Sequence, residues 1–366
     1  MKSVKNPFTP SFGGEPAYFA GRRDIVENFL FGLENGPGDP NRCTILTGAR
    51  GTGKTVTLFE IANKAAQIGW ISAKATAIPG MLNEILYKIR DAAKDFIDTP
   101  SDSKLTSVTI GPISGSRSVE SKKKTFGQEF NELLDELNER EIGLLIEIDE
   151  VRANLPEFRE FAAVFQDVVS TKKDAALLMA GLPHEINGVY TDKSISFLRR
   201  ARTQRLEAIS LSETKVTIRK TVEFAGRSID KEALEMATNA TGGFPYLIQL
   251  VGYEIWRQNP TNEVISRQNV VDGIEIAKGF MATSLFELTI QDVSDKDREF
   301  LIAMSEESLP VKSAKIADKL GVTTNYASQY RIRLISEGII FSPSRGYLDF
   351  AIPYFVEFIQ NRYLDI

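Results

Sequence analysis

Short apolar segments alternate with amphipathic segments along the first 211 residues of the chain. The apolar segments predicted as strands are Cys43–Thr47, Trp70–Ile78, Gly143–Glu150, Ala175–Ala180 and Arg205–Leu211. Apolar residues at helical spacing predict helices over about Arg22–Gly32, directly after Thr55, and over Pro79–Ile97, Phe126–Arg140 and Phe158–Ser170. Apolar strands that alternate with helices are typical of a parallel sheet covered on both faces, so the pattern predicts an α/β fold.

The pattern changes after about Ser212, where the predicted strands stop and helical periodicity continues alone. The helices predicted there are Thr214–Phe224, Lys231–Ala240, Phe244–Gln258 and Ser266–Ala282. From about Asp292, three helices precede two strands around a turn, at Lys296–Ser305, Lys312–Leu320, Thr323–Glu337, Gly338–Phe341 and Tyr347–Phe350. This order of elements is the order of a winged helix.

The pattern therefore divides the chain into three domains: a core of residues 1–211, an all-helical lid of residues 212–290 and a winged-helix domain of residues 291–366. A length of 366 residues agrees with two or three domains. Within the core, the stretch at about 98–125 is rich in Ser, Gly, Pro and Lys and is predicted as a surface insertion, with a small hairpin around Val108–Ile113 and a basic end at Lys122–Lys124.

Composition excludes several kinds of chemistry. The single cysteine, Cys43, excludes a disulfide framework, and no Cys/His cluster suggests a zinc site. The single histidine, His184, argues against a catalytic dyad or triad that contains histidine, and so against most serine and cysteine hydrolases and most His-ligated metalloenzymes. The formal net charge of −5 argues against a generally basic nucleic-acid binder. The first residues lack the apolar stretch of a signal peptide and no long apolar window predicts a membrane span, so a cytoplasmic location is expected.

A glycine-rich motif follows the first predicted strand and opens the next predicted helix. Gly48-x-x-x-x-Gly53-Lys54-Thr55 is a complete P-loop signature in the context it requires. Its backbone N–H groups and the helix N-terminus suit phosphate oxygens, Lys54 suits the β- and γ-phosphates, and Thr55 suits Mg²⁺. The predicted nucleotide-binding residues of this loop are Gly48, Ala49, Arg50, Gly51, Thr52, Gly53, Lys54, Thr55 and Val56.

Two acidic residues end the predicted strand Gly143–Glu150, in the manner of a Walker B strand. Asp149 is expected to hold Mg²⁺, directly or through water, and Glu150 to orient or deprotonate the attacking water. Alone, this pattern is weak, and an ordinary strand end would be the better interpretation; the preceding phosphate loop favours the catalytic interpretation. Glu147, inside the strand, has no partner that the sequence can identify.

Together with these motifs, three more segments carry a family resemblance. Tyr18–Asp24 resembles the aromatic-Gly-Arg box of initiator-type AAA+ and STAND ATPases, and Thr241–Leu250 resembles the Gly-x-Pro box of their helical lid. Phe197–Arg202 resembles the arginine-bearing segment before their last core strand. With the winged-helix order, nearly the whole chain resembles a bacterial or archaeal AAA+/STAND ATPase of the origin-recognition, initiator-like kind.

The resemblance implies ATP or ADP with Mg²⁺ as cofactors and a role for several residues. Phe19, Gly21 and Arg22 would line the adenine site, and Pro245 would contact the base or ribose from the lid. Arg199, Arg200 or Arg202 would sense the γ-phosphate, in cis or across a subunit interface; a solvated helix end explains these arginines equally well.

The sequence also departs from the family pattern. Ile25 stands where the aromatic-Gly-Arg box usually carries Glu. The strand Ala175–Ala180 leads into Gly181-Leu182-Pro183-His184 where the family usually places a polar sensor. These departures favour a slow ATPase that works as a switch. His184 could substitute for the missing sensor, but a lone loop histidine is more often simply exposed.

The predicted helix Thr323–Glu337 takes the place of a recognition helix, with Tyr326, Tyr330 and Leu334 expected to face inward. The candidate DNA contacts are Asn325, Gln329, Arg331 and Arg333 on this helix and Arg345 at the tip of the wing. Residues 292–366 carry nine basic and eleven acidic residues, whereas residues 312–345 carry six basic and two acidic ones. That distribution favours modest phosphate contact rather than strong non-specific binding.

The leading hypothesis is an ATP-binding AAA+ ATPase that uses a nucleotide-dependent conformational switch and associates with double-stranded DNA through its winged helix. The alternative is a STAND-type signalling or defence switch whose winged helix contacts a protein instead. Self-association is open under both hypotheses, and no membrane partner is expected.

Overall fold

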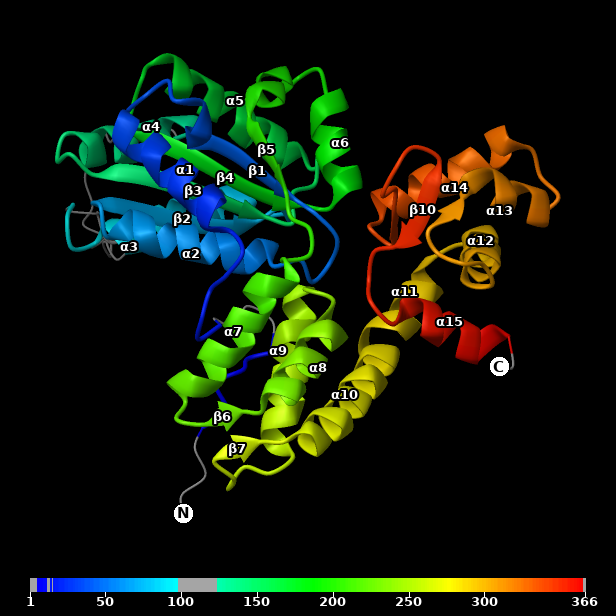
Figure 1. Ribbon diagram of the computed structural model, residues 1–366. Helices are drawn as coiled ribbons and strands as arrows, with labels where there is room; N and C mark the ends of the chain where they lie inside the picture. Colours follow the sequence, from blue (N-terminus) through cyan, green and yellow to red (C-terminus); the bar gives the residue numbers. More distant parts are fainter. Residues whose placement is uncertain (1–4, 12–13, 15, 98–123, 365–366) are drawn as a thin grey trace, which may run out of the picture.

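The computed structural model describes residues 5–11, 14, 16–97 and 124–364. Its N-terminal part is built on a five-stranded parallel sheet with the strand order β2-β3-β4-β1-β5. The strands are β1 (Cys43–Thr47), β2 (Trp70–Thr76), β3 (Gly143–Asp149), β4 (Ala175–Gly181) and β5 (Arg202–Arg205). The predicted α/β fold is therefore confirmed, and Figure 1 shows helices on both sides of the sheet.

Alternation along the strands gives the sheet two apolar faces. Leu145 faces α1 (Arg23–Asn35) and α2 (Lys54–Ala66), whose buried residues form one cluster with it. Leu144 and Ile146 face the opposite side, which is covered by α3 (Met81–Ala93), α4 (Phe126–Asn138) and α5 (Pro156–Ser170). Because both faces are covered, the central strands β3 and β4 are buried throughout.

The last core strand was predicted wrongly. It is β5 at Arg202–Arg205, and Leu211, the predicted strand end, begins helix α7. Edge strand β5 is mostly exposed, so the hydrophobic pattern that identifies a buried strand is missing there. Helix α6 (Pro183–Thr191) and a 3₁₀ turn at Ser196–Arg200 were not predicted. The predicted insertion at 98–125, with its hairpin and most of its basic end, lies largely outside the described residues.

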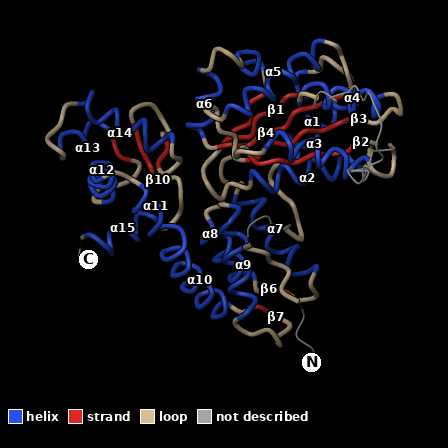
Figure 2. Tube along the Cα trace, turned by 180° about the vertical axis from the view of Figure 1, so that it is seen from behind, coloured by secondary structure: helices blue, strands red, loops and turns tan. Residues whose placement is uncertain are grey.

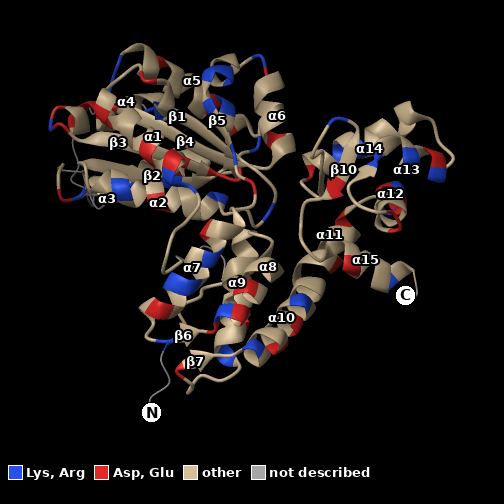
Figure 3. Cartoon of the chain, viewed as in Figure 1, with Lys and Arg blue, Asp and Glu red and all other residues tan. Residues whose placement is uncertain are grey.

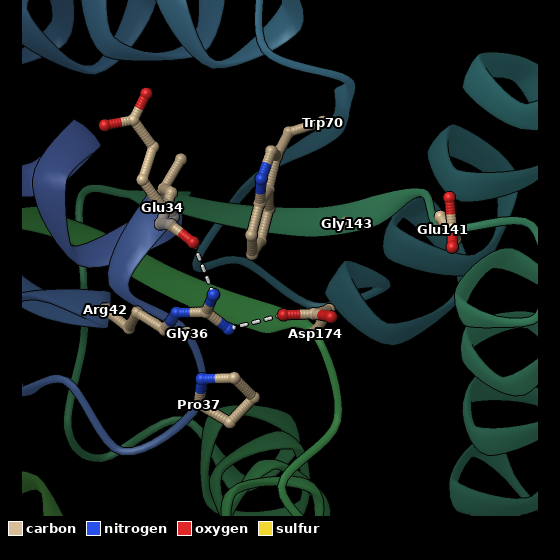
Figure 4. Close-up of a pocket in the computed structure, with 9 residues that line it drawn as sticks. Glu34, Gly36, Pro37, Arg42, Trp70, Glu141, Gly143 and Asp174 are labelled. Carbon is tan, nitrogen blue, oxygen red and sulfur yellow. Dashed lines mark hydrogen bonds and ion pairs between the residues drawn. The ribbon is translucent and has the colours of Figure 1, made fainter.

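The end of the sheet opposite the phosphate loop is closed by a buried arginine. Arg42 donates to the carbonyls of Gly32 and Leu33, pairs with Asp174 at 2.8 Å and lies over the ring of Trp70. Figure 4 shows these groups around a pocket of about 270 Å³. Every nitrogen of the guanidinium has a hydrogen-bond partner. Two partners are carbonyls of α1 and the third is Asp174, directly before β4, so Arg42 joins α1 to the sheet.

The second part of the chain is helical, as predicted, with α7 (Leu211–Phe224), α8 (Lys231–Thr241), α9 (Pro245–Arg257) and α10 (Arg267–Met281). It also contains a two-stranded parallel ladder, β6 (Ser228–Ile229) with β7 (Val264–Ile265), which is too short to leave a pattern in the sequence. Phe8 from the N-terminal segment is 1% exposed and packs against Gly252 of α9. The segment around Phe8 therefore packs on the helical part and not on the sheet.

A nearly continuous helical path, through α10, the π-turn Ala282–Phe286 and α11 (Glu287–Asp292), leads to the last part of the chain (Figure 2). We call residues 295–363 the C-terminal unit. It contains α12 (Asp295–Ser305), β8 (Val311–Lys312), α13 (Ser313–Lys319), α14 (Thr324–Ser336), β9 (Ile340–Phe341), β10 (Tyr347–Phe350) and α15 (Phe355–Tyr363). Its three strands form an antiparallel sheet in the order β8-β10-β9. Strand β8 and helix α15 were not predicted.

In the described part of the chain, no helix combines the length and the apolar character needed to cross a membrane.

Candidate nucleotide site

The phosphate loop connects β1 to α2 at the carboxyl edge of the sheet, and its glycines are required by its backbone. Gly51 and Gly53 have φ angles of +78° and +86°, which favour glycine. A Cβ on Gly48 would lie 2.5 Å from the carbonyl oxygen of Leu206. Gly53 is the N-cap of α2, so the loop leads directly into a helix N-terminus, where backbone N–H groups and the helix dipole favour an anion.

Lys54 turns its ammonium group back into this loop. Its Nζ donates to the carbonyl oxygens of Gly48 at 2.9 Å and Ala49 at 2.8 Å. Burial lowers the pKa of Lys54 to about 8. A phosphate in the loop would offer this lysine an anionic partner in place of two neutral carbonyls, which favours the charged form.

Thr55 and Asp149 meet at the end of the sheet, as the two motifs predict. The hydroxyl of Thr55 donates to Oδ2 of Asp149 at 2.9 Å, and the carboxylate of Asp149 is largely buried. Glu150 follows in the left-handed region with a φ of +52°, and its N–H donates to Oδ1 of Asp149 at 3.0 Å. Glu150 is exposed, so its carboxylate is accessible to a water molecule next to the loop.

The two oxygen donors suit a hard divalent cation. Mg²⁺ typically takes one or two protein oxygens and completes its shell with water and phosphate oxygens, and Thr55 and Asp149 provide such a pair. Within the described residues, no three His, Cys, Asp or Glu side chains gather as a metal site of their own. A cation here would therefore depend on the phosphates of a nucleotide.

Sequence reasoning missed Lys74, which the structure places at the same carboxylate. Its Nζ lies 3.2 Å from Oδ2 of Asp149, and Lys74 is in register with Glu147 on the neighbouring strand. The signal in the sequence was a lysine in the middle of a predicted strand, but the strand that pairs with it cannot be identified without the sheet order.

Glu147 is buried, with 2% of its surface exposed, and burial raises its pKa to about 7. Within the described residues its Oε2 has no hydrogen-bond partner. The carboxyl group lines a pocket of about 490 Å³ beside β2, together with Ser72, Lys74 and Lys88.

The aromatic-Gly-Arg box reaches the phosphate loop through its arginine. Arg22 donates to the carbonyl oxygens of Gly21, Thr52 and Glu207, and thereby links the box, the loop and the segment after β5. Burial lowers the pKa of Arg22. Phe19 is half-buried against the apolar cluster of α1 and α2.

The Gly-x-Pro box of the helical part lies directly on the same loop. The N–H of Tyr246 donates to the carbonyl oxygen of Gly51 at 3.1 Å. A Cβ on Gly51 would come within 2.7 Å of the ring of Phe244, and Pro245 lies next to Gly53. The loop is thus enclosed between the sheet and the first turn of α9.

The three candidate arginines lie apart from this cluster. Arg199 donates from Nε to the carbonyl oxygen of Tyr190 at 2.6 Å, and Arg200 and Arg202 are exposed. No hydrogen bond or ion pair joins any of the three to the phosphate loop in the residues described. Both explanations of these arginines therefore stay open.

In α14, one candidate DNA contact is used inside the C-terminal unit. The guanidinium of Arg333 pairs with the buried carboxylate of Asp297, at 2.7 and 2.6 Å, and lies over the ring of Tyr330. Asn325 and Gln329 are exposed and Arg331 is half-buried. Tyr326, which was expected to face inward, is 46% exposed.

Ion pairs also reduce the basic character predicted for residues 312–345. Lys315 pairs with Glu307, and Lys319 pairs with Glu306 and Glu307. Figure 3 shows both signs of charge along α12–α14. Among the described residues of this stretch, the cations without an ion pair are Lys312, Arg331 and Arg345, so the predicted basic face is smaller than the sequence suggests.

The C-terminal unit contacts the core next to the phosphate loop. A Cβ on Gly338, just after α14, would lie 3.0 Å from Cα of Ala49. His184 in α6 donates from Nδ1 to the carbonyl oxygen of Ser336 at 3.1 Å. The only histidine of the chain is therefore an interface residue, which corrects the expectation of a simply exposed side chain.

Comparison with solved structures places this arrangement in a known class of fold. A Walker-type ATPase of Pyrococcus abyssi matches with a TM-score of 0.66 and 17% identity, over 93% of this chain and 95% of that one. The ORC2 protein of Aeropyrum pernix, solved in ADPNP–ADP complexes, matches with a TM-score of 0.64 and 15% identity, over 96% of both chains. Cdc6p of Pyrobaculum aerophilum matches with a TM-score of 0.52 and 15% identity, over 96% of this chain and 97% of that one. The chain thus has the fold of P-loop ATPases similar to Cdc6 and ORC proteins.

Sequence comparison adds less. Residues 283–359 match the family model of a domain of unknown function, DUF8462. No protein of curated function matches the sequence.

Proposed function

We propose that the protein is an AAA+ ATPase that binds ATP or ADP with Mg²⁺ between the sheet and the helical lid. The observation that carries the proposal is the arrangement of Lys54, Thr55 and Asp149 around a loop enclosed by Tyr246 of the lid. The three-domain division of the sequence, with residues 291–366 as a winged helix, is part of the proposal.

Each residue of the arrangement has a role that its position supports. Lys54 leaves the loop carbonyls and pairs with phosphate oxygens, while the N–H groups of the loop hold the remaining charge. Thr55 and Asp149 would hold Mg²⁺, and a bound Mg²⁺ would supply positive charge beside the phosphates. Glu150 orients the water that attacks the γ-phosphate.

Steady-state phosphate release tests the catalytic part. We expect slow turnover by the wild-type chain, because β4 ends at Gly181 and is followed by Leu182 and Pro183, where the family it resembles usually carries a polar sensor. Glu150→Gln should lower the turnover at least tenfold and leave ATP binding unchanged, since the amide cannot accept the proton of the water. Glu160→Gln, an exposed position on α5, is the matched control. Equal turnover of wild type and Glu150→Gln would remove Glu150 from the mechanism.

We further propose that the C-terminal unit associates with double-stranded DNA. Asn325, Gln329 and Arg331 present amide and guanidinium groups for base edges, and Arg345 lies in the turn between β9 and β10. Arg333 is left out of this set because it is paired with Asp297.

One observation favours the alternative, a STAND-type switch whose C-terminal unit contacts a protein. The unit lies against Ala49 and His184, so it is positioned to respond to the state of the loop without DNA. A mobility-shift assay with duplex DNA at low salt, with and without ATP, separates the two functions. Retardation that Arg331→Ala and Arg345→Ala weaken supports DNA association, whereas no retardation under either condition supports the alternative.

A further inference from the structure

Lys74 lies beside two carboxyl groups of the neighbouring strand. Its Nζ is 3.2 Å from Oδ2 of Asp149, the same oxygen that accepts the hydroxyl of Thr55. Lys74 is in register with Glu147, and side chains in register on neighbouring strands point to the same face of the sheet. One lysine therefore has two acidic neighbours, of which it contacts one.

The second neighbour has an unused acceptor. Oε2 of Glu147 has no hydrogen-bond partner within the described residues, although the residue is 2% exposed. The carboxyl group has a hydrogen bond with the side chain of Ser72, but no ion pair is found for it among the described residues, and a buried acceptor left without a partner is costly. Glu147 and Lys74 line the same pocket of about 490 Å³, so the flexible lysine side chain has space to move between the two groups.

We propose that Lys74 is a positioning residue for the metal ion. When Mg²⁺ enters with the nucleotide, the ammonium group of Lys74 leaves Asp149 and pairs with Glu147. This inference rests on the proposed nucleotide site. A divalent cation beside Oδ2 of Asp149 repels an ammonium group about 3 Å from that oxygen. Glu147 then accepts the displaced ammonium, which lowers the free energy needed to free Asp149.

Opposite effects on the Mg²⁺ requirement follow for the two residues. Lys74→Met removes the competitor for Asp149, so the Mg²⁺ concentration that gives half-maximal ATP binding should fall about threefold to tenfold. Glu147→Gln removes the acceptor for the displaced lysine and keeps the shape of the side chain, so the requirement should rise by a similar factor. ATP affinity in EDTA should change less than twofold in both variants, because neither residue contacts the phosphate loop.

A double variant distinguishes this exchange from two separate structural effects. If Glu147 acts through Lys74, Glu147→Gln has no further effect in the Lys74→Met background. Lys88→Met is the matched control, since Lys88 lines the same pocket and has no ion pair with Asp149. Lys74→Arg keeps the charge and serves as a second variant if Lys74→Met does not fold; it should keep a Mg²⁺ requirement close to that of the wild type.

The experiment is a titration of Mg²⁺ at fixed ATP, with binding measured by the fluorescence of a labelled ATP analogue on the full chain. A lower requirement for Lys74→Met, a higher one for Glu147→Gln and a double variant equal to Lys74→Met support the proposal. The same effect of Glu147→Gln in both backgrounds overturns it, and so does an unchanged requirement in Lys74→Met. ATP binding by the wild-type chain that is absent or independent of Mg²⁺ contradicts the proposed function itself.

Discussion

The phosphate loop and the exposed face of α14 are both candidate ligand surfaces, and they are built in opposite ways. In the loop, the backbone makes the site. Glycine is required at positions 48, 51 and 53 by close contacts or by a positive φ, and the side chains of Lys54 and Thr55 lie in the first turn of the helix that follows. On α14, the backbone is an ordinary helix and only side chains distinguish one function from another. A site made by the backbone leaves a fixed spacing in the sequence, whereas a site made by side chains on a helix depends on their partners in space.

The two surfaces are nevertheless connected. Gly338, two residues after the end of α14, lies on Ala49 of the loop, and the carbonyl oxygen of Ser336 accepts a hydrogen bond from His184. Pro245 and Tyr246 contact the loop from the other side. A nucleotide that rearranged the loop would therefore change the surroundings of both the helical part and the C-terminal unit, which is the physical basis that a nucleotide-dependent switch would need.

The largest effect is expected where backbone and lid meet. In Gly243→Ala the new Cβ would lie 1.9 Å from the carbonyl oxygen of Ile209 at a φ of +74°. We expect the free energy of unfolding, measured with urea, to fall by about 4 kcal/mol. Gly69→Ala is the control, because its φ is +86° and no atom lies within 4 Å of its Cβ; its loss should be about 1 kcal/mol. Equal losses of the free energy of unfolding in the two variants would show that Gly243 does not pack against the backbone of Ile209.

A smaller effect separates structure from recognition on α14. Arg333→Ala leaves the buried carboxylate of Asp297 without its partner, so we expect a loss of about 2 kcal/mol in the free energy of unfolding, reduced by the partial exposure of the arginine. Arg331→Ala should change stability by less than about 0.5 kcal/mol. Arg333→Ala with wild-type stability and lost DNA retardation would return Arg333 to the recognition surface.

The smallest effect tests the contact between the two surfaces. His184→Ala removes the hydrogen bond from the partly exposed imidazole to the carbonyl oxygen of Ser336. Such a hydrogen bond contributes about 1 kcal/mol to the free energy of unfolding. Hydrogen exchange of the amides in α14 should accelerate up to about fivefold, while exchange in β4 stays unchanged. Unaltered exchange in α14 would mean that this hydrogen bond does not hold the unit against the core.

The same contrast explains which predictions from sequence succeeded. The strands β1, β3 and β4 were predicted because burial on both faces imposes a nearly continuous apolar pattern on them. The partly buried strand β2 and most helices were predicted because apolar residues recur along one face of each. The exposed strand β5 and the two-residue strand β8 carry no such pattern, and the prediction failed there. The fixed spacing of the phosphate loop predicts a role for each residue around Lys54. No local pattern predicts that Lys74 and Arg333 form ion pairs with Asp149 and Asp297, which are distant in the sequence.

Equilibrium binding of ATP with Mg²⁺ is the measurement that tests the central claim most directly. It compares the wild-type chain with Lys54→Ala, and uses Lys64→Ala as the control, a lysine on the same helix that pairs with Glu60 outside the loop. We predict saturable binding by the wild type and by Lys64→Ala, and a loss of affinity of about 100-fold in Lys54→Ala, because a charge-assisted contact to phosphate is removed. Equal affinity of Lys54→Ala and the wild type would contradict the account, since the nucleotide would then bind elsewhere.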